Sequence, residues 1–388
     1  MSSAVGEEKV TAVFLSPKFL LAILVGFILV LLALFITSFP YPAGWDFRNN
    51  LWAPSFLLVN RQSPYNLTMM YEIGSAVWMP VAIGMFWPLG YLPLQQASNL
   101  WWIITLISLI AIVWLSSGYQ RPPKYLFTVT LILAFLFPPT ISHFSLGQIT
   151  VLICFLFMVL SIYGQKLHPL LIAILIALTL SKPQLAIFIL PGYIYSYIKE
   201  NGSSQAVKLI FLIFLSIGIL SIPLFTYYPR WIIDFFQNLM ENPDWAHPSS
   251  LFLLRTNFNR IGEILWYMLL FLVSGINLWL WTRLPKRDAA VWSLALTTLV
   301  TPYIWSWDFV LLIPLIVSYL FNKKQKSSTW LIYFAYFSCW GVIAYMKLTG
   351  RISDELYWWV PWYLIGFVIF SSLLNWPSVK LRLNTLFN

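Results

Sequence analysis

The stretch VKLIFLIFLSIGILSIPLF, residues 207–225, is almost entirely apolar and contains a single charged residue, Lys208. A helix needs about 20 such residues to cross the roughly 30 Å hydrocarbon core of a bilayer. The stretch therefore predicts a transmembrane helix. Similar runs recur through the chain, so the sequence predicts a protein that crosses a membrane many times.

Eleven further apolar runs bring the predicted number of transmembrane helices to about twelve. They cover residues 18–38, 99–116, 124–137, 148–163, 169–180, 185–198, 264–281, 289–303, 309–321, 330–346 and 358–374. Several are shorter than an upright span requires, so they must lie inside the bundle or extend into flanking loops. We predict an all-α polytopic membrane protein in which residues 1–388 form a single integral membrane domain. The run at 18–38 is too long for a signal-peptide core and is predicted to be a retained first helix.

The composition supports a membrane protein and argues against several other classes. Hydrophobic residues make up 60% of the 388 residues and charged residues only 9%, whereas soluble proteins carry about 25% charged residues. The net charge of +10 comes from basic residues scattered over short loops, which does not indicate a nucleic-acid partner. Cys154 and Cys339 lie in apolar runs, so neither a disulfide nor a metal site is expected.

The distribution of basic residues predicts the orientation in the membrane. The apolar segment 80–93 has prolines at both ends, and as a helix it would cover roughly 21 Å, which is too short to cross. If it does not cross, fifteen of the 23 Lys and Arg residues lie in cytoplasmic loops, as the positive-inside rule requires. If it crosses, that count inverts. We therefore predict that segment 80–93 lies on the outer surface and that both termini are cytoplasmic.

In this topology two loops on the outer face are long, residues 40–97 and 226–263, and most acidic residues lie outside. Function is expected there, since long loops carry sites and short turns connect helices. Apolar residues recur at helical spacing across residues 50–61. They predict an amphipathic helix in the membrane interface within the first outer loop.

Asp46 stands out in this loop because it follows the first helix closely, between two aromatic residues and two positions before Arg48. A carboxylate near the membrane surface can be partly desolvated and still ionise, which suits a general base. The alternative is an ordinary loop acid, and local features alone favour that alternative.

An ordered set of short motifs resembles glycosyltransferase family 87, which comprises membrane mannosyltransferases of the GT-C superfamily. The resemblance spans residues 46–314. The motifs that carry it are, in order, Asp46-Phe47, Pro64-Tyr65-Asn66, Pro80, Pro88-Leu89, Pro93 with Ala97, Leu100 and Trp101, Gly147-Gln148, Lys182-Pro183, Ser250-Leu251, and Pro302 with Trp305. The resemblance implies a GT-C-like fold. One departure is that Pro302–Asp308 contains no histidine, where family members often have one, so Trp307 or Asp308 would have to substitute.

The resemblance also implies an inverting transfer of a hexose, mannose in this family, from a polyprenyl-phosphate sugar to an acceptor hydroxyl of a glycolipid or glycan. It implies a single catalytic carboxylate, which maps onto Asp46. No acid is needed to protonate a phosphate leaving group. No cofactor and no metal are expected, since no histidine has a second ligand at metal-binding spacing.

The remaining candidate site residues would bind substrate. A departing phosphate needs cations, and Lys182 between two apolar runs is the first candidate, with a snorkelling lysine as the alternative. Arg255 and Arg260 follow, with lipid headgroup contact as the alternative. Arg48 is either a further cation or the ion-pair partner of Asp46. The other candidates are Gln148, Tyr65, Trp305 and Asp308.

Two other functions remain open. A transporter or lipid flippase would favour paired broken helices and two related halves, which the sequence does not display. A polymerase or ligase acting on lipid-linked glycans would share a site on the outer face. For the transferase, the family implies a multi-pass protein of the plasma membrane with its active site outside.

Overall fold

The computed structural model describes residues 44–66, 78–118, 122–241, 246–322, 329–351 and 353–374. Within these ranges the secondary structure is helical and includes no strand. This confirms the predicted all-α class. The run predicted at 18–38 lies outside the described residues.

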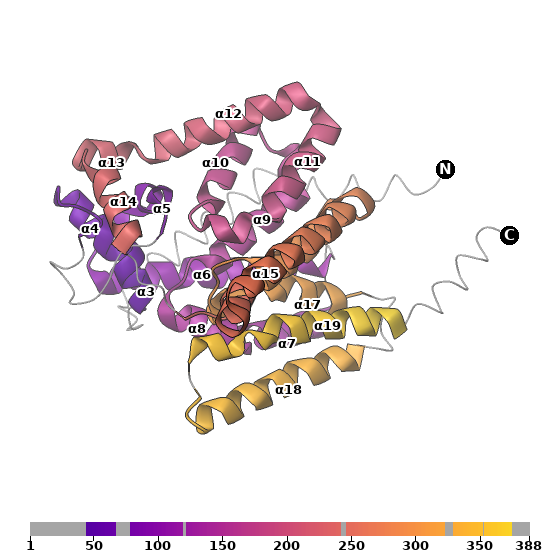
Figure 1. The fold of residues 1–388 in the computed structure, drawn as a ribbon. Helices are drawn as coiled ribbons and strands as arrows, with labels where there is room; N and C mark the ends of the chain where they lie inside the picture. Colours follow the sequence, from indigo (N-terminus) through magenta and orange to yellow (C-terminus); the bar gives the residue numbers. More distant parts are fainter. Residues whose placement is uncertain are drawn as a thin grey trace.

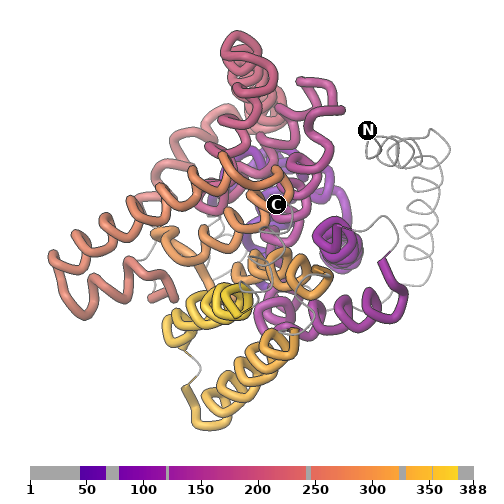
Figure 2. Tube along the Cα trace, turned by 90° about the vertical axis from the view of Figure 1, so that its right-hand side faces the viewer, coloured from indigo at the N-terminus to yellow at the C-terminus, as the bar shows by residue number. Residues whose placement is uncertain are grey.

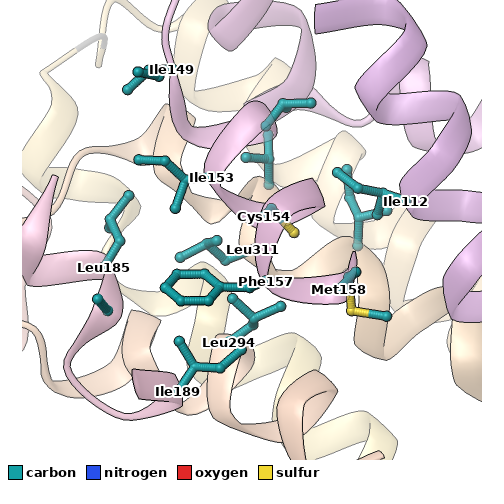
Figure 3. Packing of buried hydrophobic residues seen from close by; sticks show 14 of the residues in the cluster. Ile112, Ile149, Ile153, Cys154, Phe157, Met158, Leu185, Ile189, Leu294 and Leu311 are labelled. Carbon is teal, nitrogen blue, oxygen red and sulfur yellow. The ribbon is translucent and has the colours of Figure 1, made fainter. Parts of the chain in front are cut away.

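Helix α9 (Thr150–Tyr163) lies at the centre of the bundle. It packs against α6 (Leu94–Ser117), α10 (Pro169–Thr179) and α16 (Lys286–Val300). Figure 3 shows Phe157 of α9 among Leu294, Leu311 and Ile189, which come from other helices. Close packing of large apolar side chains from several helices holds α9 in place. The first residues of α9 belong to the candidate site.

The remaining long helices surround this centre. Helices α11 (Ile189–Asn201) and α12 (Ser203–Leu220) lie on one side, and α18 (Thr329–Leu348) pairs with α19 (Trp359–Leu374) on the other. Figures 1 and 2 show α12 and α18 at opposite edges of the bundle. Large exposed apolar residues such as Phe211, Phe214 and Phe334 mark surfaces suited to lipid.

Five helical segments in the described part of the chain are long and apolar enough to span a membrane, or six if one bent pair counts as a span. They are Leu94–Ser117, Ser203–Tyr227, Ser250–Arg283, Thr329–Leu348 and Asp354–Leu374, and the bent pair joins Lys124–Leu136 to Pro138–Leu146 at 62°. Each of the eleven apolar runs in the described part forms helix. The predicted number of twelve transmembrane helices is not confirmed, because α9, α10 and α17 (Ile313–Leu320) are short and largely buried.

The predicted helix at residues 50–61 is present as a π-helical turn, η1 (Arg48–Trp52), continued by α4 (Ala53–Val59). It follows a short first turn, α3 (Trp45–Phe47). It is more buried than an interfacial helix would be, since Leu51 and Leu58 are both fully covered. Segment 80–93 forms α5 (Pro80–Phe86) and the 3₁₀ turn η3 (Trp87–Tyr91), neither of which is long enough to span.

The predicted second outer loop is largely helical. It contains the end of α13 (Ile222–Tyr227), then α14 (Trp231–Glu241), and the first turns of α15 (Ser250–Arg283). Helix α15 therefore begins 14 residues before the run predicted at 264–281, with a break at Asn259, whose φ is 51°. Figure 1 shows α3, α4, α5, α13 and α14 gathered at one end of the molecule.

The candidate active site

Two glycines bring the α3 turn against the start of α9. A Cβ on Gly44 would overlap the backbone of Leu146 and Gly147, and a Cβ on Gly147 would come within 2.5 Å of the Phe47 Cβ. Gly147 also has a φ of +72°, a conformation that residues with a Cβ rarely adopt. The indole of Trp101 donates to the Gly147 carbonyl at 2.9 Å. This close approach places Asp46 beside Gln148, 102 positions later in the chain.

Asp46 is buried, and both of its carboxylate oxygens accept hydrogen bonds. Asn50 Nδ2 donates to Oδ1 at 3.1 Å, and Gln148 Nε2 donates to Oδ2 at 2.5 Å. Burial raises the pKa of Asp46 to about 6, while the charge of Lys182 and the two amide donors oppose the rise. The pKa of this carboxyl group is therefore closer to neutral pH than that of an ordinary aspartate.

Lys182 connects this carboxylate to a second one. Its ammonium group lies 2.7 Å from Gln148 Oε1, 3.0 Å from Asp308 Oδ1 and 3.4 Å from Thr150 Oγ1. Thr150 also donates to Asp308 Oδ1. An ammonium group has three donors, so each of them has a protein partner here. Lys182 and Asp308 form a buried ion pair, and Gln148 is held at one end by Lys182 and at the other by Asp46.

Local sequence explains how each element presents its side chain. Pro183 disfavours helical backbone at the preceding residue, and Lys182 accordingly has φ −131° and ψ 81° after the end of α10. His143 accepts a hydrogen bond from the Val151 backbone N–H at 3.0 Å through Nε2. That imidazole satisfies one of the amide groups left open at the start of α9, next to Thr150.

Aromatic side chains lie beside the cluster on the segment that leads into the 3₁₀ helix η6 (Ser306–Leu312). Trp305 and Trp307 stack with ring centroids 4.8 Å apart and planes 7° apart, and the Trp305 indole donates to the Tyr303 hydroxyl at 2.8 Å. Both residues are partly exposed. The imidazole of His247 packs edge-on against Tyr303, 4.8 Å between centroids. A histidine thus reaches the aromatic segment from the connection between α14 and α15.

Asp354 holds the beginning of η6 from the turn before α19. Its Oδ2 accepts from the Ser306 backbone N–H at 3.0 Å, and its Oδ1 accepts from the Ser306 hydroxyl. Asp308 closes the same turn by accepting from the Trp305 N–H at 3.3 Å. Two carboxylates therefore fix the backbone that carries the stacked indoles.

The structure brings some of the sequence-predicted residues together and leaves others apart. Asp46, Gln148, Lys182 and Asp308 form one cluster, which we call the Asp46–Asp308 cluster. Trp305 adjoins it through its backbone contact with Asp308.

Four other candidates have contacts of a different kind. Arg48 is half-buried and donates to Asn49 Oδ1 at 3.2 Å. Tyr65 is buried against Phe235, with 5.3 Å between ring centroids. Arg255 and Arg260 are exposed on α15, and Arg255 pairs with Glu263 at 3.3 Å. The contacts of Arg255 fit a surface ion pair better than a phosphate site.

An open apolar groove of about 560 Å³ lies along α11 and reaches the segment that carries Lys182. Leu180 and Pro183, on either side of the lysine, line one end, and it continues along one face of α11 as far as Ile198. The lining residues on α11 recur every three or four positions, as one helix face requires. The groove therefore has one end at residues that flank Lys182 in the sequence, and its lining is apolar.

Within the described residues no group of three or more His, Cys, Asp or Glu side chains is placed to hold a metal ion. The fold and the cluster together define a helical protein with several candidate membrane spans and a buried cluster of charged and amide side chains. The sequence model of glycosyltransferase family 87 matches residues 78–314, more than half of the chain, and the protein belongs to this family. It is a membrane glycosyltransferase. No curated protein and no solved structure matches the chain.

The match confirms the resemblance to glycosyltransferase family 87 for residues 78–314. It covers Gln148, Lys182 and Asp308, and it begins after Asp46. The link between Asp46 and the matched region therefore rests on the Gln148 contact. Sequence reasoning missed Asn50, which lies one helical turn after Asp46 and offers an amide on the same face.

Proposed function

We propose that the protein moves a hexose, mannose being the first choice, from a polyprenyl phosphate to an acceptor hydroxyl of a glycolipid or glycan, with inversion. Asp46 is the general base in this proposal. One observation supports it above the others: a buried carboxylate with a pKa of about 6 is held by two amide donors at the edge of a buried charged cluster. A base that titrates near the working pH combines the ionised form with useful basicity.

The hydrogen bonds leave Asp46 able to act. Each carboxylate oxygen has two lone pairs, and one donor occupies each oxygen. The hydroxyl group of the sugar acceptor can therefore donate a further hydrogen bond to a free lone pair of the Asp46 carboxylate. As the hydroxyl oxygen attacks the anomeric carbon, its proton passes to Asp46, and the bond from that carbon to the phosphate oxygen breaks. The phosphate leaves as an anion and takes no proton.

Lys182 serves two purposes in the proposal. Its bond to Gln148 Oε1 fixes the amide so that the Nε2 group faces Asp46. Its charge, which is buried with the cluster, acts over a longer range than a surface charge and favours a nearby departing phosphate. Direct contact with the phosphate would require Lys182 to exchange one of its present partners. Arg48 is the second cation we propose for the phosphate.

The apolar groove is the proposed site of the polyprenyl chain. Leu180 and Pro183, the sequence neighbours of the Lys182 segment, line one end, and the groove follows α11; in this proposal the phosphate end of the lipid lies at that end. Trp305 and Tyr65 are proposed as sugar-contacting aromatics, since the apolar face of a sugar packs on an aromatic ring. The glycan acceptor would then reach Asp46 from the side opposite the groove.

The proposed location is the outer face of the plasma membrane, with cytoplasmic termini. The positive-inside rule assigns four connections, carrying Asp46, Gln148, Lys182 and Asp308, to the same side. The side chains of these four residues lie in one cluster. Four connections on the same side of the membrane are needed for such a cluster, which supports this topology.

The test is transfer by purified protein in liposomes containing a radiolabelled polyprenyl-phosphate sugar and extracted lipid acceptors. Asp46→Asn should lower transfer by about 10²- to 10⁴-fold, the usual contribution of a general base. Glu263→Gln is the matched control, because it neutralises a partly exposed acid of the Arg255 surface ion pair, far from the cluster in sequence, and it should retain transfer. Undiminished transfer by a folded Asp46→Asn protein would refute the base assignment.

The same liposomes distinguish the alternatives. Movement of a labelled lipid across the bilayer without any glycosidic product would indicate a flippase. Products carrying several added sugars would indicate a polymerase. Offering polyprenyl-phosphate mannose beside other hexose donors identifies the sugar.

A further inference from the structure

Helix α14 (Trp231–Glu241) has an exposed surface with an unusual distribution of polarity. At about 100° per residue, its side chains divide into three sectors. The first sector, which we call the apolar sector, spans an arc of about 120°. It consists of Ile232, Ile233, Phe236, Leu239 and Met240, whose exposed fractions run from 40% to 78%.

The second sector is polar and exposed, and it contains Gln237 and Glu241. The third faces the protein: Trp231 and Phe235 are buried, and Asp234 and Asn238 are half-buried. A helix on the surface of a soluble protein has its apolar side chains inward and polar ones outward. Here both inward and outward directions contain apolar residues, so α14 must border more than one medium.

The protein-facing sector fixes α14 to the segment after α4. Phe235 packs on Tyr65 with 5.3 Å between ring centroids, and Asp234 accepts a hydrogen bond from the Ser63 hydroxyl. Trp231 packs edge-on against Phe225 at 5.2 Å. Because these contacts hold the protein-facing sector against the protein, the helix cannot rotate to bury its apolar sector.

We propose that α14 lies in the plane of the bilayer surface, with its apolar sector among the lipid acyl chains and its polar sector in the aqueous phase. The apolar sector continues a lipid-facing surface, because the candidate span Ser203–Tyr227 ends three residues before α14 and its last turns expose Ile222 and Phe225. An amphipathic helix at the interface buries its apolar face about 5–10 Å into the headgroup and acyl boundary.

The size of the apolar sector favours lipid over a protein partner. A stable protein–protein interface takes roughly 20–30 residues from each side, whereas this sector offers five side chains, with Gln237 and Glu241 at its border. Lipid requires no matching surface. The consequence is that α14 holds Ser63 and Tyr65 at headgroup depth, the level at which the head of a lipid-linked substrate lies.

The experiment places nitroxide labels on single introduced cysteines in phosphatidylcholine nanodiscs. Ile233→Cys and Met240→Cys probe the apolar sector, and Gln237→Cys and Glu241→Cys are matched controls on the same helix. Cys154 and Cys339 are buried, so the parent chain measures background labelling. Collisions with oxygen, which concentrates in lipid, are compared with collisions with a water-soluble nickel chelate.

The oxygen-to-nickel collision ratio should be several-fold higher at positions 233 and 240 than at 237 and 241. Equal ratios at all four positions would overturn the proposal. Spin–spin broadening at 233 that disappears on dilution with unlabelled protein would also overturn it, because a second copy would then cover the sector. If one apolar-sector variant is poorly folded, Ile232→Cys replaces it. The measurement needs no transfer activity, so its outcome is independent of the proposed function.

Discussion

Lys182→Met separates the electrostatic role of the lysine from its shape. Methionine keeps much of the apolar stem and removes the ammonium group, which leaves the fully covered Asp308 carboxylate without its ion-pair partner. Breaking a buried pair in this way costs about 3–5 kcal/mol. Thr150 still donates to Asp308 Oδ1, so we expect a loss near the lower end, about 3 kcal/mol. Denaturant unfolding in detergent micelles, followed by tryptophan fluorescence, measures it.

The double variant Lys182→Met/Asp308→Asn tests the cause. Without a buried charge to compensate, it should recover most of the lost stability, since a neutral pair avoids the desolvation of an unpaired carboxylate. Lys182 also lowers the pKa of Asp46, so the acidic limb of the pH–transfer profile should move upward in any residual activity of the single variant. A single variant as stable as the wild type, or a double variant no better than the single, would refute the reasoning.

Three further outcomes are expected. The pKa of Asp46 rises from 3.8 to about 6 on folding, so ionisation of this carboxyl group opposes folding once the pH exceeds the unfolded-state pKa. Asp46→Asn should therefore raise the melting temperature above pH 6 and leave it unchanged near pH 4. Scanning calorimetry tests this. Gly147→Ala should lower the free energy of unfolding by at least about 1–2 kcal/mol because Gly147 has a positive φ, and it should reduce transfer. Gly218→Ala should be neutral, because a Cβ there meets nothing within 4 Å. A Gly147→Ala protein with unchanged stability and transfer would contradict the close-approach argument. Asp354→Asn should lower transfer mainly through KM by loosening the stacked indoles, while Glu355→Gln should not, and equal effects of the two would argue against a positioning role.

The helices were predictable from the sequence because apolar runs have a direct physical consequence. Runs such as 330–346 and 358–374 form α18 and α19 within a few residues of their predicted bounds. The number of spans was not predictable in the same way. A leucine inside a helical bundle and a leucine facing lipid tails are equally apolar, so the run that forms α9 has the same signature as a lipid-facing span. Only packing distinguishes them.

The cluster was predictable in its members and not in its contacts. Asp46 and Lys182 carry local signals, an acid beside the membrane and a lysine between apolar runs. The pairing of Lys182 with Asp308 joins positions 126 apart, and nothing in either neighbourhood specifies the partner. Asp354 gave no signal at all, since its role depends on α19 packing beside η6. The break at Asn259 was hidden for a related reason, because it interrupts a run that continues as helix on both sides.

The charge balance of the cluster leads to a final expectation about substrate binding. Lys182 pairs directly with Asp308 and is connected to Asp46 through Gln148, so the ionised Asp46–Asp308 cluster, with two carboxylates and one lysine, carries one net negative charge. The donor brings more negative charge. At an effective dielectric constant of 20, one unit charge about 6 Å away contributes roughly 3 kcal/mol, which disfavours the ionised form of Asp46. Donor binding should therefore make Asp46 a stronger base and raise its pKa. The acidic limb of kcat, which reports the bound enzyme, should lie about one to two pH units above that of kcat/KM, which reports the free enzyme. Coincident limbs would mean that a cation fully neutralises the phosphate before the chemical step, and Arg48 would then be the residue to substitute next.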